Sequence, residues 1–275
     1  MTSGHHRRAP QVCDAAAWKQ FRLLAHSAGL DPDDRWVGGY VSYEWNHARH
    51  FFDAYVHELD SSRVLEFGCN VGASSVVLAA LGANVIAVDT DARFVDLARA
   101  QISAYGLNGL VNVIHLDGAV HELPFGDSSF DVIVCNSVLE YVDWACLAIV
   151  QKELLRVLSP GGLILVLSTS NRLWPKEVHS GKWLSNYVPR KVDRLCRKSL
   201  QRGVSPFKIR AGFSGCVLVD KEDNSGAYLA ARAHMGTSAS LIAAMRLVST
   251  ILRPFRVTVG MLMPSFALVL RRQAA

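Results

Sequence analysis

The 275-residue sequence lacks an uninterrupted run of about 18 apolar residues, so no membrane-spanning helix is predicted. It also lacks a repeat of fixed period, which argues against solenoid and propeller architectures. The basic residues near the N-terminus are not followed by the apolar core of a secretory signal, so we expect a cytoplasmic protein. Half of the residues are apolar, enough for one elaborated domain with a full core.

No C-x-x-C pair occurs among the six cysteines, at positions 13, 69, 135, 146, 196 and 216. Neither a disulfide framework nor a zinc-ligand spacing is therefore present. We expect reduced, buried thiols and no metal site.

Positive charge is concentrated in one segment. Residues 190–210 contain eight basic residues against Asp193, whereas the whole chain carries a net charge of +5. The segment fits a solvated helix face, or a contact for an anionic substrate or a peripheral membrane surface. It lacks the interleaved aromatic residues that stack bases, so we expect no nucleic-acid partner. The basic residues are Arg190, Lys191, Arg194, Arg197, Lys198, Arg202, Lys208 and Arg210.

Residues 64–72, Val-Leu-Glu-Phe-Gly-Cys-Asn-Val-Gly, are typical of a buried strand that enters a ligand-binding turn. Gly68 and Gly72 tolerate positive φ, and Asn70 is well suited to replace a glycine there. The helix expected from about Ala73 to Leu81 would direct its unpaired N–H groups at an anionic ligand group. Asp89 ends the next apolar run, 21 residues after Gly68, where an acid accepts hydrogen bonds from ribose hydroxyls.

The turn lacks the middle glycine of the dinucleotide fingerprint G-x-G-x-x-G, because Asn70 stands there and Ala73 takes the last glycine's place. NAD is therefore disfavoured. The pattern Glu66-x-Gly68-x-Asn70-x-Gly72 instead resembles the first motif of the class I S-adenosylmethionine methyltransferases, an acid followed by alternating glycines.

Three later segments extend this resemblance in register over about residues 60–170. The run 112–118 ends in Asp117 and Gly118 and precedes Leu123-Pro-Phe125, residues 130–142 resemble the family's fourth strand and the helix turn after it, and residues 154–167 resemble the helix, proline-glycine turn and fifth strand that follow. The chain is most similar to the ubiquinone/menaquinone-biosynthesis type of the family.

The resemblance implies a Rossmann-like α/β fold: a seven-stranded, mostly parallel sheet with a final antiparallel strand and helices on both faces. It implies S-adenosylmethionine as the cofactor and Asp117 as a contact of the adenine amino group. Glu66 either touches the ligand or only orders the turn. The expected cofactor-binding residues are Glu66, Gly68, Cys69, Asn70, Gly72, Asp89, Thr90, Asp117, Gly118 and Asn136.

Four regions are expected: an N-terminal helical and aromatic lid (1–60), the cofactor-binding core (61–170), an inserted acceptor cap containing the basic segment (171–237), and a closing helix with the last strands (238–275). Helical spacing predicts a helix over 14–28 with Asp14 as N-cap. An aromatic loop over 36–52 is expected to enter a helix that reaches Glu58. A helix over 238–252 and strands over 255–260 and 265–270 complete the prediction.

Methyl transfer to a weakly acidic acceptor needs a base. The family often carries histidine in the helix turn after the fourth strand, where this chain has Tyr141, itself a catalytic candidate. Other base candidates are His47, His50, His121 and His179. We favour His179, which follows the fifth strand, with Glu177 either orienting it or acting instead. An apolar acceptor pocket is predicted from Tyr40, Tyr43, Trp45, His47 and Trp174, although the aromatics of 36–52 could equally only fasten the N-terminal helix to the core.

The sequence thus predicts an S-adenosylmethionine-dependent methyltransferase for an oxygen or carbon of a small, apolar or lipid-like natural-product acceptor. One alternative is an S-adenosylmethionine-binding protein that catalyses cyclisation or pericyclic chemistry, including methylation-triggered cyclisation of a prenyl group, or that has no catalytic role. A nicotinamide-dependent oxidoreductase is disfavoured by Asn70. The N-terminal helix could pack on its own chain or on a second copy, so a homo-oligomer is compatible with the sequence.

Overall fold

A computed structural model describes residues 8–118, 120, 122–189, 191–196 and 200–274. The chain divides into two compact units, residues 1–119 with 130–133, and residues 120–129 with 134–275. Strand β4, Phe130–Asn136, contributes residues to both units.

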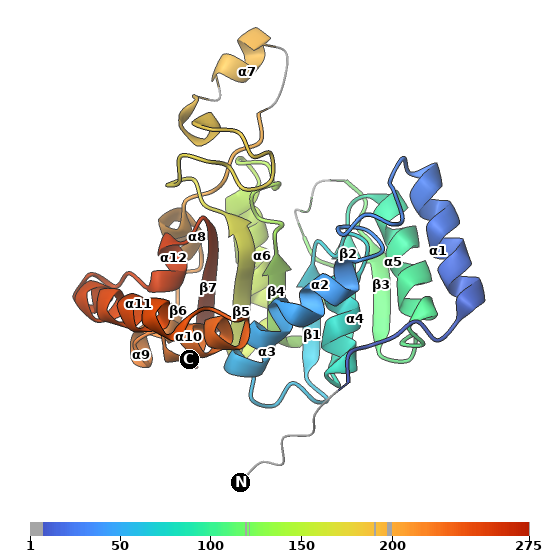
Figure 1. Ribbon diagram of the computed structural model, residues 1–275, viewed down its shortest axis with the longest axis horizontal. Coiled ribbons are helices and arrows are strands. Elements are labelled where there is room, and N and C mark those ends of the chain that lie inside the picture. Colours follow the sequence, from blue (N-terminus) through green and yellow to red (C-terminus); the bar gives the residue numbers. More distant parts are fainter. Residues whose placement is uncertain (1–7, 119, 121, 190, 197–199, 275) are drawn as a thin grey trace. The chain divides into compact units, whose positions relative to one another are not determined.

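The first unit alternates strands and helices after a helical N-terminal segment (Figure 1). Strands β1, β2 and β3 are parallel, with Arg63 opposite Asn84 and Val85 opposite Val111. Parallel strands covered on both faces need nearly continuous apolar sequence, which β1 supplies with the fully buried Val64. The elements are α1 (Ala15–Ser27), α2 (Tyr40–Asn46), α3 (Ala48–Tyr55), β1 (Arg63–Phe67), α4 (Ala73–Ala80), β2 (Asn84–Asp89), α5 (Ala92–Ala104) and β3 (Val111–His115).

Helix α1 confirms the predicted N-terminal helix. Asp14 caps it by accepting hydrogen bonds from the Ala16 and Ala17 backbone N–H groups at 2.9 and 3.0 Å. Helix α1 packs on α5 (Figure 1), and its buried residues are Phe21 and Ala25.

The prediction of a loop over 36–52 is wrong for most of this stretch. The stretch contains helix α2 and most of α3. Trp45, Ala48 and Phe52 are buried at helical spacing. The aromatic residues from Tyr40 to Phe52 therefore lie on helices, whereas Trp36 precedes α2.

The second unit contains the antiparallel end of the sheet. Strand β5 pairs antiparallel with β7, and β7 pairs antiparallel with β6. The elements are α6 (Leu147–Val157), β5 (Leu158–Ser170), η1 (Ser185–Tyr187), α7 (Lys191–Cys196), α8 (Pro206–Gly212), β6 (Cys216–Leu218), α9 (Val219–Glu222), α10 (Gly226–His234), α11 (Ala239–Leu252), η2 (Arg253–Phe255), α12 (Val259–Leu262) and β7 (Ser265–Arg272).

Two of the three predictions for the C-terminal segment hold. Helix α11 and strand β7 confirm the helix over 238–252 and the strand over 265–270. The strand predicted over 255–260 is wrong, because η2 ends there and α12 begins at Val259. The edge strand is instead β6, from within the segment 171–237.

The strand order is β3-β2-β1-β4-β5-β7-β6 in one seven-stranded sheet. The order reverses between β1 and β4, and in open α/β sheets ligands bind beyond the carboxyl ends of the strands at such a point. The predicted fold, a mostly parallel sheet with antiparallel pairing at one end and helices around it, is confirmed.

In the part of the chain that the structure describes, no helix combines the length and apolarity needed to cross a bilayer. The five cysteines whose side chains the structure describes are free, and among them the predicted burial holds for Cys69 and Cys135, whereas Cys13 is exposed and Cys146 and Cys216 are half-buried. The side chain of Cys196 lies outside the described residues.

Candidate cofactor and catalytic sites

The loop after β1 bends through three residues with left-handed backbone. The φ angle is +79° at Gly68, +50° at Asn70 and +86° at Gly72. The Gly68 and Cys69 backbone N–H groups donate to the Val88 carbonyl oxygen at 2.9 and 3.0 Å, which fixes the loop to the end of β2. The loop therefore presents bare backbone at the carboxyl end of β1.

Gly72 directly precedes α4, and the space beside it is closed. A Cβ atom at Gly72 would lie 3.0 Å from the Ala98 Cβ on α5, so the loop packs against that helix without room for a side chain. The first N–H groups of α4 have no partners within the helix and lie at its positive dipole end. Such a helix start suits an anionic ligand group.

The Asp89 carboxylate connects this loop with the start of α5. Oδ2 accepts from the Asn70 N–H at 2.8 Å, and Oδ1 accepts from the Asp91 N–H at 3.0 Å. Each carboxylate oxygen has a second lone pair. The half-buried Asp89 can therefore order the loop and still accept hydrogen bonds from ligand hydroxyl groups.

His115, which the sequence did not single out, joins Thr90 to Asp117. Its Nε2 lies 3.1 Å from the Thr90 carbonyl oxygen, and its Nδ1 lies 3.2 Å from Asp117 Oδ1. The Asp117 side chain is 97% exposed, and Gly118 beside it has a φ of +72° with nothing within 4 Å of an added Cβ. Asp117 therefore has its carboxylate in solvent, accessible to a ligand.

Two other predicted cofactor residues are buried. Glu66 accepts hydrogen bonds from Ser75 and Ser74 on α4, and burial raises its pKa to about 8. Its burial and its hydrogen bonds to the start of α4 favour the interpretation that it orders the turn. The Cys69 thiol is also buried, which raises its pKa.

In the second unit, the turn after β4 meets the segment after β5. His179 Nε2 lies 2.9 Å from Glu140 Oε1 and 3.3 Å from Ser137 Oγ. Glu140 Oε1 also accepts from the Ser170 N–H at 3.0 Å, and the Glu140 side chain is fully buried. Burial lowers the pKa of His179, but the hydrogen bond and charge of Glu140 and the charge of Glu177 outweigh it, so the net shift is upward.

Glu177 and Tyr141 flank this pair. Glu177 accepts from the backbone N–H groups of His179 at 3.1 Å and Ser180 at 2.6 Å. Although burial alone would raise the Glu177 pKa, these hydrogen bonds lower it overall. The centroids of the Tyr141 and His179 rings lie 5.8 Å apart. Burial, together with the charges of Glu140 and Glu177, raises the Tyr141 pKa to about 12. Tyr141 therefore keeps its proton at neutral pH.

Asn136, also predicted to bind the cofactor, is buried at the end of β4. Ser137 follows with a φ of +53°, and its N–H donates to the Leu167 carbonyl oxygen at 2.9 Å. This left-handed turn directs the chain from the strand toward Glu140.

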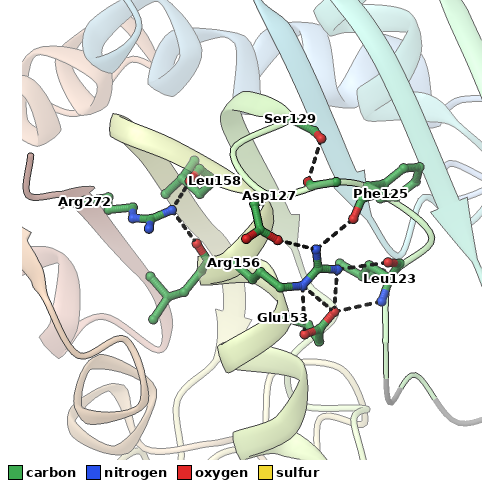
Figure 2. A network of polar contacts seen from close by, with 10 residues as sticks. Leu123, Phe125, Asp127, Ser129, Glu153, Arg156, Leu158 and Arg272 are labelled. Atoms are coloured by element: carbon green, nitrogen blue, oxygen red, sulfur yellow. Dashed lines mark hydrogen bonds and ion pairs between the residues drawn. The ribbon is translucent and has the colours of Figure 1, made fainter. Parts of the chain in front are cut away.

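The motif segment Leu123-Pro-Phe125 is fixed to α6 by polar contacts (Figure 2). The Arg156 guanidinium donates to the carbonyl oxygens of Leu123 at 3.0 Å and Phe125 at 2.8 Å, and to Asp127 at 2.9 Å. Glu153 accepts from Arg156 and from the Leu123 N–H. The segment thus contributes a structural connection in the second unit.

The aromatic residues predicted to form an acceptor pocket are divided between the units. The Tyr43 ring on α2 stacks on the His47 ring, with 3.9 Å between the ring centroids. The Tyr43 and Trp36 ring centroids lie 4.7 Å apart, and the Trp36 ring also contacts the Tyr40 ring. The Arg35 guanidinium lies 4.3 Å from the Trp36 ring centroid, so the cluster already holds a cation.

The other predicted pocket residues have contacts of their own. Trp45 is buried, with the Arg49 guanidinium 4.9 Å from its ring centroid. Trp174, in the second unit, donates from Nε1 to the Leu262 carbonyl oxygen at 2.6 Å. These contacts give both tryptophans structural roles.

Among the other base candidates, His47 Nδ1 lies 2.7 Å from the Tyr43 carbonyl oxygen. His50 Nε2 lies 3.5 Å from Arg49 Nη2. His121 lies outside the described residues. Arg190, Arg197 and Lys198 of the basic segment also lie outside the described residues. In the same segment, Arg202 is buried, and its Nη1 lies 2.7 Å from Asp193 Oδ2.

Glu140 is the main residue that sequence reasoning missed. The only available signal was an acid beside Tyr141 in the turn after the fourth strand. The sequence signal for His115 was weaker still. Its only distinguishing feature is its position at the end of an apolar strand, two residues before Asp117.

The family model described as a methyltransferase domain matches residues 65–166. This interval contains the loop after β1, Asp89, His115, Asp117 and Glu140. His179 follows it.

Curated relatives match over a similar part of the chain. A demethylmenaquinone methyltransferase from Clavibacter sepedonicus is 34% identical over 39% of this chain and 41% of that protein. A ubiquinone biosynthesis O-methyltransferase from Xanthomonas oryzae pv. oryzae is 34% identical over 48% of this chain and 54% of that protein. The chain therefore spans about half, or less, of the length of these relatives.

Two solved structures share the fold. An S-adenosylmethionine-dependent methyltransferase from Mesorhizobium loti aligns with a TM-score of 0.52 at 17% identity, covering 81% of this chain and 95% of that one. A putative sarcosine dimethylglycine methyltransferase from Galdieria sulphuraria aligns with a TM-score of 0.50 at 17% identity, covering 84% of each chain.

These matches confirm the resemblance predicted from the sequence. Residues 65–166 match a methyltransferase domain, and S-adenosylmethionine is the cofactor that this match implies.

Proposed function

We propose, from the premise that residues 65–166 are an S-adenosylmethionine-dependent methyltransferase domain, that the whole chain transfers a methyl group to an oxygen or carbon of a small, apolar or lipid-like acceptor. The observation that carries the proposal is the Asp89 carboxylate, which orders the Asn70 loop and keeps lone pairs for ligand hydroxyls. The roles in natural-product biosynthesis and the cytoplasmic location stay predictions.

The first unit supplies groups that fit the cofactor. Asp89 would hold its ribose hydroxyls, the solvent-exposed Asp117 its adenine amino group, and the start of α4 its carboxylate. When bound, S-adenosylmethionine supplies an electrophilic methyl group on a positively charged sulfur. The residues of the chain then have to align the acceptor with that methyl group and exclude water.

We assign His179 as the general base. Its Nε2–H donates to the buried Glu140, and this tautomer leaves a lone pair on Nδ1, which makes no hydrogen bond within the described part of the chain. A proton from the acceptor would pass to Nδ1 while the methyl–carbon or methyl–oxygen bond forms. The positive charge that develops on the ring is balanced by Glu140.

Glu140 is therefore a positioning residue, since it acts through His179. Glu177 has a different part, because it binds backbone N–H groups and fixes the segment from which His179 projects. The upward pKa shift of His179 means that the base is strong but needs a pH above its pKa.

Two measurements test the proposed function. Titration calorimetry should show binding of S-adenosylmethionine and S-adenosylhomocysteine and no binding of NAD. Incubation with labelled S-adenosylmethionine and extracts of the source organism should then give a labelled product one methyl group heavier than its precursor.

Each outcome has a clear meaning. NAD binding in place of S-adenosylmethionine binding would refute the cofactor assignment. S-adenosylmethionine binding with a product that gains no methyl group would favour cyclisation or pericyclic chemistry, and binding with no product at all would favour a non-catalytic role.

A further inference from the structure

Asp89 and Asp117, the two acids assigned to the cofactor, follow neighbouring strands of the first unit. Asp89 ends β2, and His115 ends β3 directly opposite it in the parallel register. The Leu116 N–H donates to the Asp89 carbonyl oxygen at 2.9 Å, which fixes the chain leaving β3 to the end of β2. His115 therefore lies between the acid assigned to the ribose and the acid assigned to the adenine.

The Asp117 side chain extends into solvent from an open turn. It is 97% exposed, and Gly118 after it has a φ of +72° with open space around an added Cβ. Among the described residues, His115 holds its carboxylate, with Nδ1 3.2 Å from Oδ1. A side chain in solvent loses rotamer freedom when it binds a ligand, and this loss weakens binding. A residue that already restrains Asp117 removes part of that cost.

The His115 ring is itself oriented from both sides. Its Nε2 lies 3.1 Å from the Thr90 carbonyl oxygen, directly after β2, and its Nδ1 faces Asp117. An ionised carboxylate only accepts hydrogen bonds, so the contact with Asp117 requires a hydrogen on Nδ1. The contact engages Asp117 Oδ1 and leaves Oδ2 available for an N–H group of a ligand.

The other acids at this edge of the sheet have donors of their own. Asp89 accepts from backbone N–H groups at 2.8 and 3.0 Å. The Asp91 carboxylate accepts from Arg93 Nε at 3.0 Å and from Arg93 Nη2 at 2.6 Å. The pairing is therefore specific, because Arg93 holds Asp91 and His115 holds Asp117.

We propose that His115 is a positioning residue for adenine recognition, which holds Asp117 so that its second carboxylate oxygen accepts from the adenine amino group. The proposal rests on the proposed function, which assigns that amino group to Asp117. His115 acts through Asp117 and away from the His179 cluster. Its loss should therefore weaken cofactor affinity and nucleobase selectivity and leave kcat at saturating S-adenosylmethionine unchanged.

Calorimetry of the full chain with two ligands tests the proposal. The ligands are S-adenosylhomocysteine and its deamino analogue, in which hydrogen replaces the adenine amino group. The unchanged chain should bind S-adenosylhomocysteine at least about tenfold more tightly than the analogue, because the analogue leaves Asp117 without its hydrogen bond.

Two substitutions separate the two contacts of the ring. His115→Asn places an amide nitrogen near the position of Nδ1, so it keeps a donor for Asp117 and should keep most of this preference. His115→Gln places the amide nearer the position of Nε2, toward Thr90, and its preference should fall below about threefold. Equal behaviour of the two variants would overturn the proposal.

A double-mutant cycle provides a second measurement. In the Asp117→Ala background, His115→Gln should cause no further loss of affinity, because the two residues act as one unit. The same loss in both backgrounds would also overturn the proposal. The control is His26→Gln, an exposed histidine in the last turn of α1, which should bind both ligands like the unchanged chain. All variants should keep their circular dichroism spectrum.

The outcomes also separate this proposal from the proposed function. An unchanged chain that does not bind S-adenosylhomocysteine would refute the cofactor assignment and the role of His115 together. An unchanged chain that binds it without preference over the deamino analogue would refute the roles of Asp117 and His115 and leave methyl transfer intact.

Discussion

The loop after β1 in the first unit and the His179 cluster in the second unit are built from different kinds of contact. The loop is held by backbone N–H groups that donate to Val88 and Asp89, and its key residues Gly68 and Gly72 lie four positions apart. The cluster depends on side chains, with His179 Nε2 bound to Glu140 across 39 positions of sequence. The first arrangement is a property of the local sequence, and the second appears only when β4 and β5 are brought together.

The two sites should therefore fail differently when a side chain is removed. His179→Ala should have the largest effect, a loss of about 10²–10⁴ in kcat, because it removes proton transfer. The affinity for S-adenosylmethionine, measured by calorimetry, should not change. The control is His57→Ala, an exposed histidine of the first unit. Undiminished turnover would dismiss His179 as the base.

Asp89→Ala tests the other side of the comparison. It removes hydrogen bonds from a charged group both to the ligand and to the Asn70 loop, so affinity for S-adenosylmethionine should fall by about 100-fold or more. The exposed Asp96 on α5 supplies the control Asp96→Ala, which should bind like the unchanged chain. Equal affinity of the Asp89 and Asp96 variants would contradict the assigned role.

Backbone geometry itself can be tested with a pair of glycines. Gly161→Ala adds a Cβ in open space at a φ of +78° and should lower the free energy of unfolding by about 1 kcal/mol. At Gly72 the φ is +86°, and the Cβ that Gly72→Ala adds would also lie 3.0 Å from the Ala98 Cβ. This substitution should therefore lower the free energy of unfolding by about 2–3 kcal/mol. Urea unfolding measures both. Equal losses would show that the contact with α5 carries no strain.

Most of the fold could be predicted because its signals are local. An apolar run before a glycine turn indicated β1, the apolar run that Asp89 ends indicated β2, and Asp14 marked the start of α1. These features depend on neighbours a few positions away. The resemblance added the register of the later strands.

The errors fall where tertiary packing decides. Residues 255–260 alternate like a strand, but Arg256 has a φ of +57° after Pro254, and the segment turns into α12. The real edge strand, Cys216–Leu218, has three residues, too few for a period-two pattern. It exists because β7 offers it an open edge.

The same distinction applies to the candidate site. The glycine and aspartate positions of the loop follow from the conformations that these residue types allow. Glu140 could not be found, because a buried acid in the turn after β4 is recognised only when its partner His179 is known. His179 is an intermediate case. Its place after the fifth strand makes it a candidate base, but the sequence does not indicate that Glu140 holds it.

The smallest expected effect is also the most specific for side-chain positioning. Glu140→Gln keeps an oxygen that can accept from His179 Nε2–H but removes the charge that raises the His179 pKa. The base acts when neutral, so activity is lost as the pH falls through that pKa, which lies above its ordinary value of about 6.5. In the variant, burial dominates and the pKa falls, so the acidic limb of the kcat profile should move to lower pH while the rate at high pH changes only a few-fold. Glu222→Gln is the control, and an unmoved limb would show that Glu140 does not act through His179.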